Sequence, residues 1–169
     1  MIYILGVDHF KVQLPHQNND KEKVTQFLEQ VKNVCREKKV GLIAEEVSED
    51  ALVYQGIDGT HVAKIVPGLG IEYLLCDPGQ ADRCKLGIKS REQIALELSI
   101  PFPPATTAQE DRINQIAAEF DRWREKYWLD QIKSRNGANK VVLLICGFQH
   151  VDFFSEIARK GGYVVIKIN

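Results

Sequence analysis

Apolar and polar positions alternate along the chain in blocks that predict both strands and helices. Five short apolar runs are each bounded by polar or turn-forming residues: 1–5, 40–44, 71–76, 141–146 and 163–168. Runs of this length are typical of buried strands. Apolar residues spaced by three and four predict amphipathic helices at residues 21–39, 91–98, 107–134 and 151–160. The pattern predicts an α/β fold, a three-layer sandwich with a mostly parallel sheet flanked by helices.

Strand, helix and strand follow one another at both ends of the chain, as in βαβ units. Such a unit predicts that the run at residues 1–5 and the run at 40–44 are parallel and are neighbours in the sheet. Residues 48–105 are less regular and contain a Pro-rich joint at residues 101–104. No linker divides the chain, and a length of 169 residues with 44% hydrophobic residues suits one compact domain over 1–169 with an irregular insert.

Charge and composition indicate which binding partners, which compartment and which cofactors to expect. The chain has 22 basic and 23 acidic residues, so its net charge of -1 gives no reason to expect nucleic acid or a membrane surface as a partner. No secretory leader precedes the first apolar run and no stretch reaches membrane-spanning length, so we expect a cytoplasmic protein. Four cysteines without a CxxC spacing predict reduced thiols. The chain has no phosphate-loop signature, and we expect no nucleotide cofactor.

A Gly-x-x-His pattern occurs twice, each time where an apolar run stops. Gly6 is followed by His9, and Gly147 is followed by His150. We expect each glycine to let the backbone turn sharply, so that the histidine lies just past the strand end. In an open α/β sheet that edge is where ligands bind, so two imidazoles there could share a metal, a proton or an anionic substrate. The alternative is a strand end followed by a surface histidine.

Acidic residues end the second apolar run at the same predicted edge. Glu45 or Glu46 could bind a metal beside the imidazoles or act as a general base. The pattern does not choose between the two glutamates. Their alternative role is a favourable charge in the first turn of a helix that begins near Ser48.

Three further residues are candidates for the site. Asp77 ends the third apolar run, although Asp-Pro-Gly is also a good turn. Arg83 lies six residues further on and could pair with Asp77 or bind an anion. Arg124 follows Trp123 in the long helix, and a buried guanidinium needs a carboxylate or phosphate partner. His16 and His61 have no informative spacing, and we interpret both as surface histidines.

The order of these features resembles a superfamily that includes the TraB/PrgY proteins, the Tiki proteases and the GumN-like proteins, and more distantly ChaN and erythromycin esterase. The resemblance rests on the two Gly-x-x-His motifs, the strand-end glutamates, an Arg-containing helix and a closing helix and strand. These features fall on Gly6, His9, Glu45 or Glu46, Arg124, Gly147 and His150. The chain departs from the family in its short length, in Asp8 before the first histidine and in its middle segment. The resemblance implies a shared βα scaffold with a polar, metal-binding site, and it does not imply a protease.

The leading hypothesis is a metal-dependent hydrolase acting on a small molecule or a peptide. His9, His150 and Glu45 or Glu46 would hold a divalent Mn, Co, Ni, Fe or Zn ion, which would activate a water. Arg124 would orient or neutralise an anionic group, with Asp77 and Arg83 on the substrate side. One alternative is a metal-free His/Glu hydrolase of the erythromycin-esterase type. The other is a non-enzymatic sensor or binding protein for an anionic small molecule.

Overall fold

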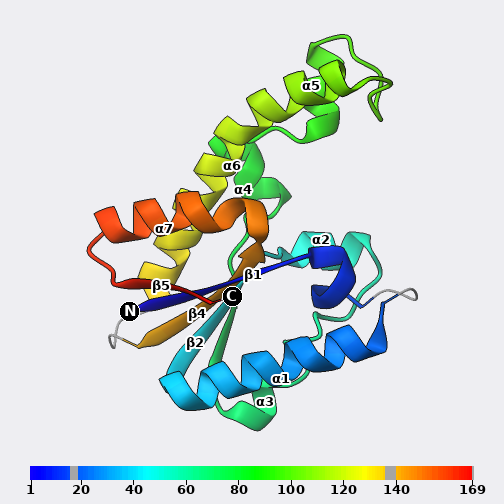
Figure 1. The fold of residues 1–169 in the computed structure, drawn as a ribbon. Helices are drawn as coiled ribbons and strands as arrows, with labels where there is room; N and C mark the ends of the chain where they lie inside the picture. Colours follow the sequence, from blue (N-terminus) through cyan, green and yellow to red (C-terminus); the bar gives the residue numbers. More distant parts are fainter. Residues whose placement is uncertain (16–18, 136–139, 169) are drawn as a thin grey trace.

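A single parallel sheet lies between two layers of helices (Figure 1). The computed structural model describes residues 1–15, 19–135 and 140–168, without the side chains of residues 9 and 10. Its five strands run in the order β3-β2-β4-β1-β5, and every neighbouring pair is parallel. The strands are β1 (Ile2–Val7), β2 (Val40–Glu45), β3 (Glu72–Leu75), β4 (Val141–Gly147) and β5 (Val165–Ile168). The predicted three-layer α/β sandwich is confirmed.

One prediction about the sheet is wrong: β1 and β2 are not neighbours, because β4 lies between them. A βαβ pattern fixes the direction of two strands but leaves room for another strand to insert between them. The run of β4 is apolar on both faces, and residues 142–147 are all buried. Burial on both faces favours the interior of a parallel sheet, and β4 lies there between two strands, β1 and β2, that are buried in the same way.

The connecting segments form nine helices and helical turns among the described residues. They are η1 (His9–Gln13), α1 (Lys21–Lys38), α2 (Glu49–Tyr54), α3 (Val66–Leu69), α4 (Gln80–Leu86), α5 (Arg91–Glu97), α6 (Thr107–Arg135), η2 (Phe148–His150) and α7 (Val151–Lys160). Asp20 caps α1, since its side chain accepts from the backbone N–H groups of Glu22 and Lys23. The chain has no described helix that combines the length and the apolar character needed to cross a membrane.

Alternate strand residues build one apolar core on each face of the sheet. Leu42 and Leu144 pack with Trp128 of α6 and Phe154 of α7. Ile43 and its odd-numbered counterparts in β1 and β4 pack against α1 and α3 on the other face. The two-residue period therefore assigns each position at a strand end to one of the two layers.

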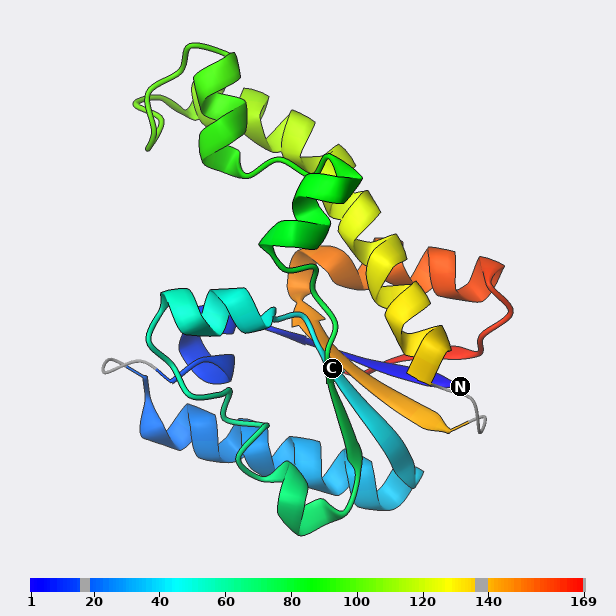
Figure 2. The same ribbon diagram turned by 180° about the vertical axis from the view of Figure 1, so that it is seen from behind.

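Helix α5 and the first half of α6 project from the sandwich as an arm (Figure 2). This arm has a small core of its own, made of Ile94, Ala95, Ile113 and Ala117. The segment predicted as an irregular insert thus supplies an edge strand, β3, and much of the arm. The four cysteines are free: Cys84 is exposed and the other three are buried.

Gly6 does not make the predicted sharp turn, because β1 continues through it to Val7. The glycine instead permits a close contact: a Cβ atom at this position would lie 2.7 Å from Cδ1 of Phe148 and 3.0 Å from Cγ2 of Val151. The absence of a side chain at Gly6 therefore lets η2 and α7 pack directly on the central sheet.

Candidate functional site

The candidate site lies at the carboxyl ends of β2 and β4, where the connections diverge. The segment after β2 passes along the α3 side to the edge strand β3, whereas α7 leads from β4 over the opposite face to β5. Such a divergence opens a crevice in which α/β proteins bind ligands. Glu46 directly follows β2, and His150 ends the turn after β4.

Glu46 connects the ends of the two central strands. Its Oε2 accepts a hydrogen bond from the backbone N–H of Gly147 at 2.8 Å. Its Oε1 accepts from Nη2 of Arg124 at 2.7 Å and lies 3.1 Å from Nε2 of His150. One buried carboxylate thus joins the second Gly-x-x-His motif to the long helix α6.

Glu45 points to the other layer of the sandwich and belongs to a different cluster. Its carboxylate is fully buried and accepts from Nε2 of Gln13 at 2.7 Å and from Oγ1 of Thr60 at 2.6 Å, as well as from the hydroxyl of Tyr73. Burial, followed by the charge of Glu45, raises the pKa of Tyr73 above its usual range. Of the two strand-end glutamates, the structure therefore brings Glu46 to His150 and gives Glu45 contacts with η1 and the segment before α3.

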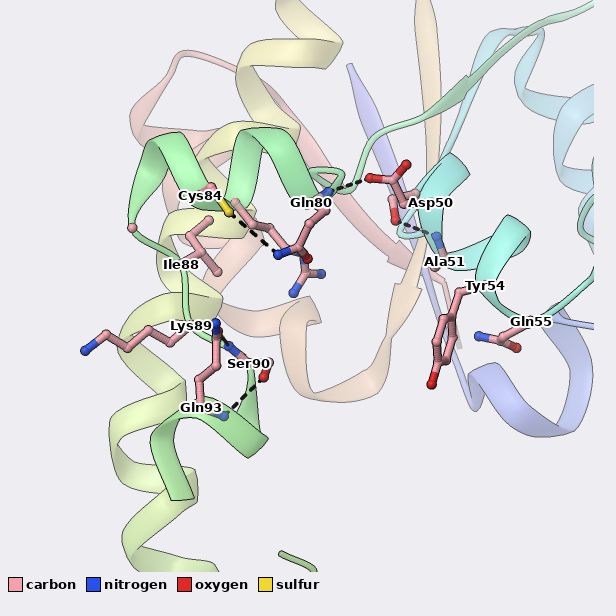
Figure 3. A pocket seen from close by; sticks show the side chains of 13 residues that line it. Asp50, Ala51, Tyr54, Gln55, Gln80, Cys84, Ile88, Lys89, Ser90 and Gln93 are labelled. Atoms are coloured by element: carbon pink, nitrogen blue, oxygen red, sulfur yellow. Dashed lines mark hydrogen bonds between the residues drawn. The ribbon is translucent and has the colours of Figure 1, made fainter. Parts of the chain in front are cut away.

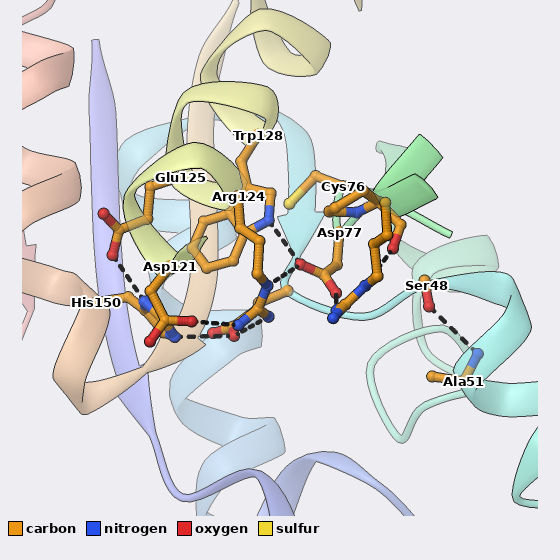
Figure 4. Close-up of polar contacts among 12 residues, drawn as sticks. Ser48, Ala51, Cys76, Asp77, Asp121, Arg124, Glu125, Trp128 and His150 are labelled. Carbon is orange, nitrogen blue, oxygen red and sulfur yellow. Dashed lines mark hydrogen bonds and ion pairs between the residues drawn. The ribbon is translucent and has the colours of Figure 1, made fainter. Parts of the chain in front are cut away.

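Arg124 contacts three carboxylates, which confirms the prediction that it holds an acidic partner (Figure 4). Its Nε donates to Asp77 at 2.9 Å and its Nη1 to Asp121 at 2.9 Å, in addition to the bond with Glu46. Burial works to lower the pKa of Arg124, but attraction to Asp77 and then to Glu46 outweighs it and raises the pKa above its ordinary value. Protein carboxylates already balance this guanidinium, so its contacts do not support a role in neutralising an outside anion.

Asp77, predicted on the substrate side, is nearly buried and engaged within the protein. Its Oδ1 accepts from Nε1 of Trp128 at 2.9 Å as well as from Arg124, and its Oδ2 accepts from Nη2 of Arg83 at 2.6 Å. Arg83 is partly exposed, unlike its partner. The predicted Asp77–Arg83 pair therefore exists, with the carboxylate inside and the guanidinium at the surface.

His150 has a carboxylate at each ring nitrogen and is 2% exposed. Nδ1 lies 2.7 Å from Oε1 of Glu125, and the ring packs edge-on against Trp128. Burial disfavours the charged imidazole, but the hydrogen bonds to Glu125 and Glu46 outweigh burial and raise the pKa of His150 to about 9. At neutral pH both ring nitrogens therefore carry a proton and donate to the two glutamates.

Glu125 and Asp121 belong to the site, and the sequence analysis missed them. Burial raises the pKa of Glu125, against the effect of its bond to His150. Oε2 of Glu125 is buried and has no hydrogen-bond partner among the described residues. Asp121, Glu125, Trp128 and Ile132 are spaced by four, three and four residues, so a polar residue on the apolar stripe of α6 was the available signal.

The remaining histidines are less informative. The backbone of His9 begins η1, a π-helical turn directly after β1, and its side chain lies outside the described part of the structure. His16 also lies outside the described residues. His61 is partly buried beside η1, where its backbone N–H donates to the carbonyl of Gln13. The predicted meeting of His9 with His150 thus stays a prediction.

The described residues fit a metal ion only in part. Within residues 1–15, 19–135 and 140–168, no group of three or more His, Cys, Asp or Glu side chains is placed to hold one. Glu46 and His150 supply two donors, and the third predicted ligand, His9, has no described side chain. The guanidinium of Arg124 contacts the same oxygen of Glu46 that faces His150 and would repel a cation there.

Comparison of the chain with protein-family models, curated proteins and solved structures found no match.

Proposed function

We propose that the chain is a hydrolase built on the scaffold of the TraB/PrgY, GumN-like and erythromycin-esterase proteins, and that the His150–Glu46 pair transfers the proton. The observation that carries the proposal is the 3.1 Å contact between Nε2 of His150 and Oε1 of Glu46, with Glu125 at the opposite ring nitrogen. A histidine held by carboxylates on both sides is the arrangement expected of an oriented acid–base group.

The convergence of distant motifs supports the family part of the proposal. Glu46 and Arg124 are 78 residues apart in the chain, and Gly147 follows Glu46 by 101 residues, yet all three meet at one carboxylate. The strand-end glutamate, the helix arginine and the second Gly-x-x-His motif are features that carry the resemblance. Their contact in the fold supports the view that they form one site.

The protonation of His150 defines its part in the reaction. With a pKa of about 9 the imidazole is charged at neutral pH, so after water has added to the carbonyl carbon Nε2 can give its proton to the leaving group as that bond breaks. The ring keeps its Nδ1 proton, which is hydrogen-bonded to Glu125, and Nε2 takes back the proton that the added water loses. Glu125 fixes the ring orientation in both steps, and Glu46 stabilises the charged form.

Hydrolysis of 4-nitrophenyl esters and of nitroanilide peptides tests this proposal. His150→Gln and Glu46→Gln should each lower kcat/KM about 100-fold, the usual contribution of a positioned acid–base group. Arg122→Gln is the matched control, because Arg122 lies on the exposed side of α6 against Phe153. Circular dichroism verifies the fold of each variant. Equal rates for the wild type and both site variants would contradict the proposal.

A metal-dependent hydrolase is the second candidate, and one observation favours it. Glu125 orients His150 through Nδ1 as carboxylates orient metal-binding histidines. Glu46 and Nε2 of His150 would supply two ligands to a divalent ion, and such an ion lowers the pKa of a bound water.

Elemental analysis of untagged protein, after addition of Mn, Co and Zn, separates the two candidates. The metal-dependent reaction requires a stoichiometric ion that His150→Ala loses and that His61→Ala, which removes an imidazole beside η1, retains. The metal-free reaction requires hydrolysis that persists after treatment with a chelator. A protein that binds metal but loses no hydrolysis on chelation would support the metal-free site.

A further inference from the structure

A cleft of about 630 Å³, lined by both polar and apolar groups, lies between α2 and the α4–α5 segment (Figure 3). Tyr54 at the end of α2 and the next residue, Gln55, line one side, and Gln80 and Cys84 of α4 line the other. Asp50 joins the two walls, since its Oδ2 accepts from the backbone N–H of Gln80 at 2.5 Å. The cleft is thus closed at one end by a hydrogen bond and open to solvent elsewhere.

A second cavity of about 250 Å³ leads from this cleft toward the buried cluster. It lies between α5 and α6 and shares Arg83, Lys89 and Ser90 with the larger cleft. Asp121 and Arg124 also line it, and Arg124 contacts Glu46. The two cavities therefore share Arg83, and Arg124 separates the smaller one from Glu46 and His150.

Arg83, which lines both cavities, has one guanidinium nitrogen, Nη1, that is not used in contacts within the described part of the protein. Its Nη2 donates to Asp77 and its Nε to the carbonyl of Pro78 at 3.0 Å, while Nη1 has no partner among the described residues. The side chain is 28% exposed. By contrast, the ammonium of Lys89 donates to Glu97 at 2.6 Å and points away from Tyr54 (Figure 3). Of the two cations among the described residues that line the larger cleft, Arg83 is therefore the one with an N–H group available to a ligand.

We infer that the substrate is a polar molecule with a carboxylate or phosphate group, and that Arg83 binds this group where the two cavities meet. A guanidinium fork suits either anion, because its N–H groups match pairs of acceptor oxygens. The hydroxyl of Tyr54 and the amide of Gln55 can hydrogen-bond the rest of the molecule in the larger cleft. The inference rests on the proposed function only in assigning the bound molecule as the substrate of the His150–Glu46 pair.

Alkylation of Cys84 reports on this site without any turnover. Cys84 lines the larger cleft and is the exposed member of the four cysteines. Iodoacetate is a carboxylate and iodoacetamide is neutral, and both react with the thiolate, so the ratio of their rates does not depend on the ionisation of the thiol. At low ionic strength we expect the ratio to be about tenfold higher than for cysteine in an unstructured peptide, because a fixed cation concentrates anions in the cleft.

Two variants separate binding at Arg83 from general electrostatic attraction. Arg83→Gln should reduce the ratio to that of the peptide. Lys85→Gln removes the same charge from the same helix, outside the cleft lining, and should leave the ratio within about twofold. A wild-type ratio equal to that of the peptide, or an equal loss in the two variants, would overturn the inference.

Competition on the wild type gives a second reading if Arg83→Gln does not fold. Inorganic phosphate and acetate, each compared with sodium chloride at equal ionic strength, should slow labelling by iodoacetate in a saturable manner. Stronger protection by one of them identifies the anion as phosphate or carboxylate, and protection no greater than that by chloride overturns the inference. If the iodoacetate-to-iodoacetamide rate ratio is raised as expected but the protein hydrolyses none of the test substrates, the proposed hydrolase activity is refuted and the anion site is supported.

Discussion

Replacement of Arg124 by glutamine removes the charge that holds three carboxylates together. The side chains of Glu46 and Asp77 are 4% and 6% exposed, so water cannot replace the guanidinium around them. Removing one partner of a buried ion pair costs about 3–5 kcal/mol, because it leaves an uncompensated charge. The contact with Asp121 adds little, since that carboxylate is 31% exposed.

We therefore expect Arg124→Gln to lower the free energy of unfolding by about 4 kcal/mol at pH 7. That is a large share of the roughly 5–15 kcal/mol available to a domain. The loss should become smaller as the pH falls from 7 to 4, since unpaired carboxylates can take up protons and lose their charge. Arg124→Lys keeps the charge without the fork and should lie between the wild type and the glutamine variant.

Urea unfolding followed by tryptophan fluorescence measures these differences, since Trp128 lies beneath Arg124 and hydrogen-bonds Asp77. Arg122→Gln removes a guanidinium that stacks on Phe153 at an exposed position, and should cost no more than about 1 kcal/mol. The reasoning is refuted if the two glutamine variants differ by less than about 1 kcal/mol at pH 7, or if the loss in Arg124→Gln is independent of pH.

Three further predictions concern the same cluster and the cleft. The pKa of His150 is raised to about 9 in the folded state from 6.5 in the unfolded chain, so protonation of His150 stabilises the fold by about 3 kcal/mol. This stabilisation is complete below about pH 6.5 and should be lost as the pH rises to about 9. In His150→Gln the urea midpoint should change less across that pH range. Trp128→Phe removes a hydrogen bond to the charged Asp77 and should cost about 1.5–3 kcal/mol in urea unfolding followed by circular dichroism. Gly79→Ala places a Cβ 2.6 Å from Oδ2 of Asp50, so its cost should be smaller in an Asp50→Ala background, and additive losses in this double-mutant cycle would contradict the contact.

Local sequence patterns predicted the layers of the fold but not the order of its strands. The apolar runs and the helical spacings are local, and each corresponds to a strand or a helix in the structure. Strand order depends on which run fills the centre of the sheet, and this is a competition among distant segments. β1, β2 and β4 are all buried on both faces, so the apolar pattern places them inside the sheet without giving their order.

The sequence does predict that Glu45 and Glu46 point to opposite layers of the sandwich. Ile43 faces the α1 layer and Ala44 faces the α6 layer, so the alternation continues to Glu45 and Glu46 in turn. The sequence does not predict which of the two layers contains His150 and Arg124, so it does not choose between the two glutamates. Glu125 was hidden for the same reason, because a carboxylate on an apolar stripe acquires meaning only when its partner on another element is known.

Asp77 connects the buried cluster around Glu46 and His150 with Arg83 in the cleft. It accepts from Arg124, which contacts Glu46, and from Arg83, which lines both cavities. An anion bound through Nη1 of Arg83 would lie on the same guanidinium that holds Asp77 through Nη2. Asp77 in turn binds Nε of Arg124, whose Nη2 donates to Glu46. A continuous row of charged contacts therefore runs from the surface at Arg83 to the carboxylate that faces His150.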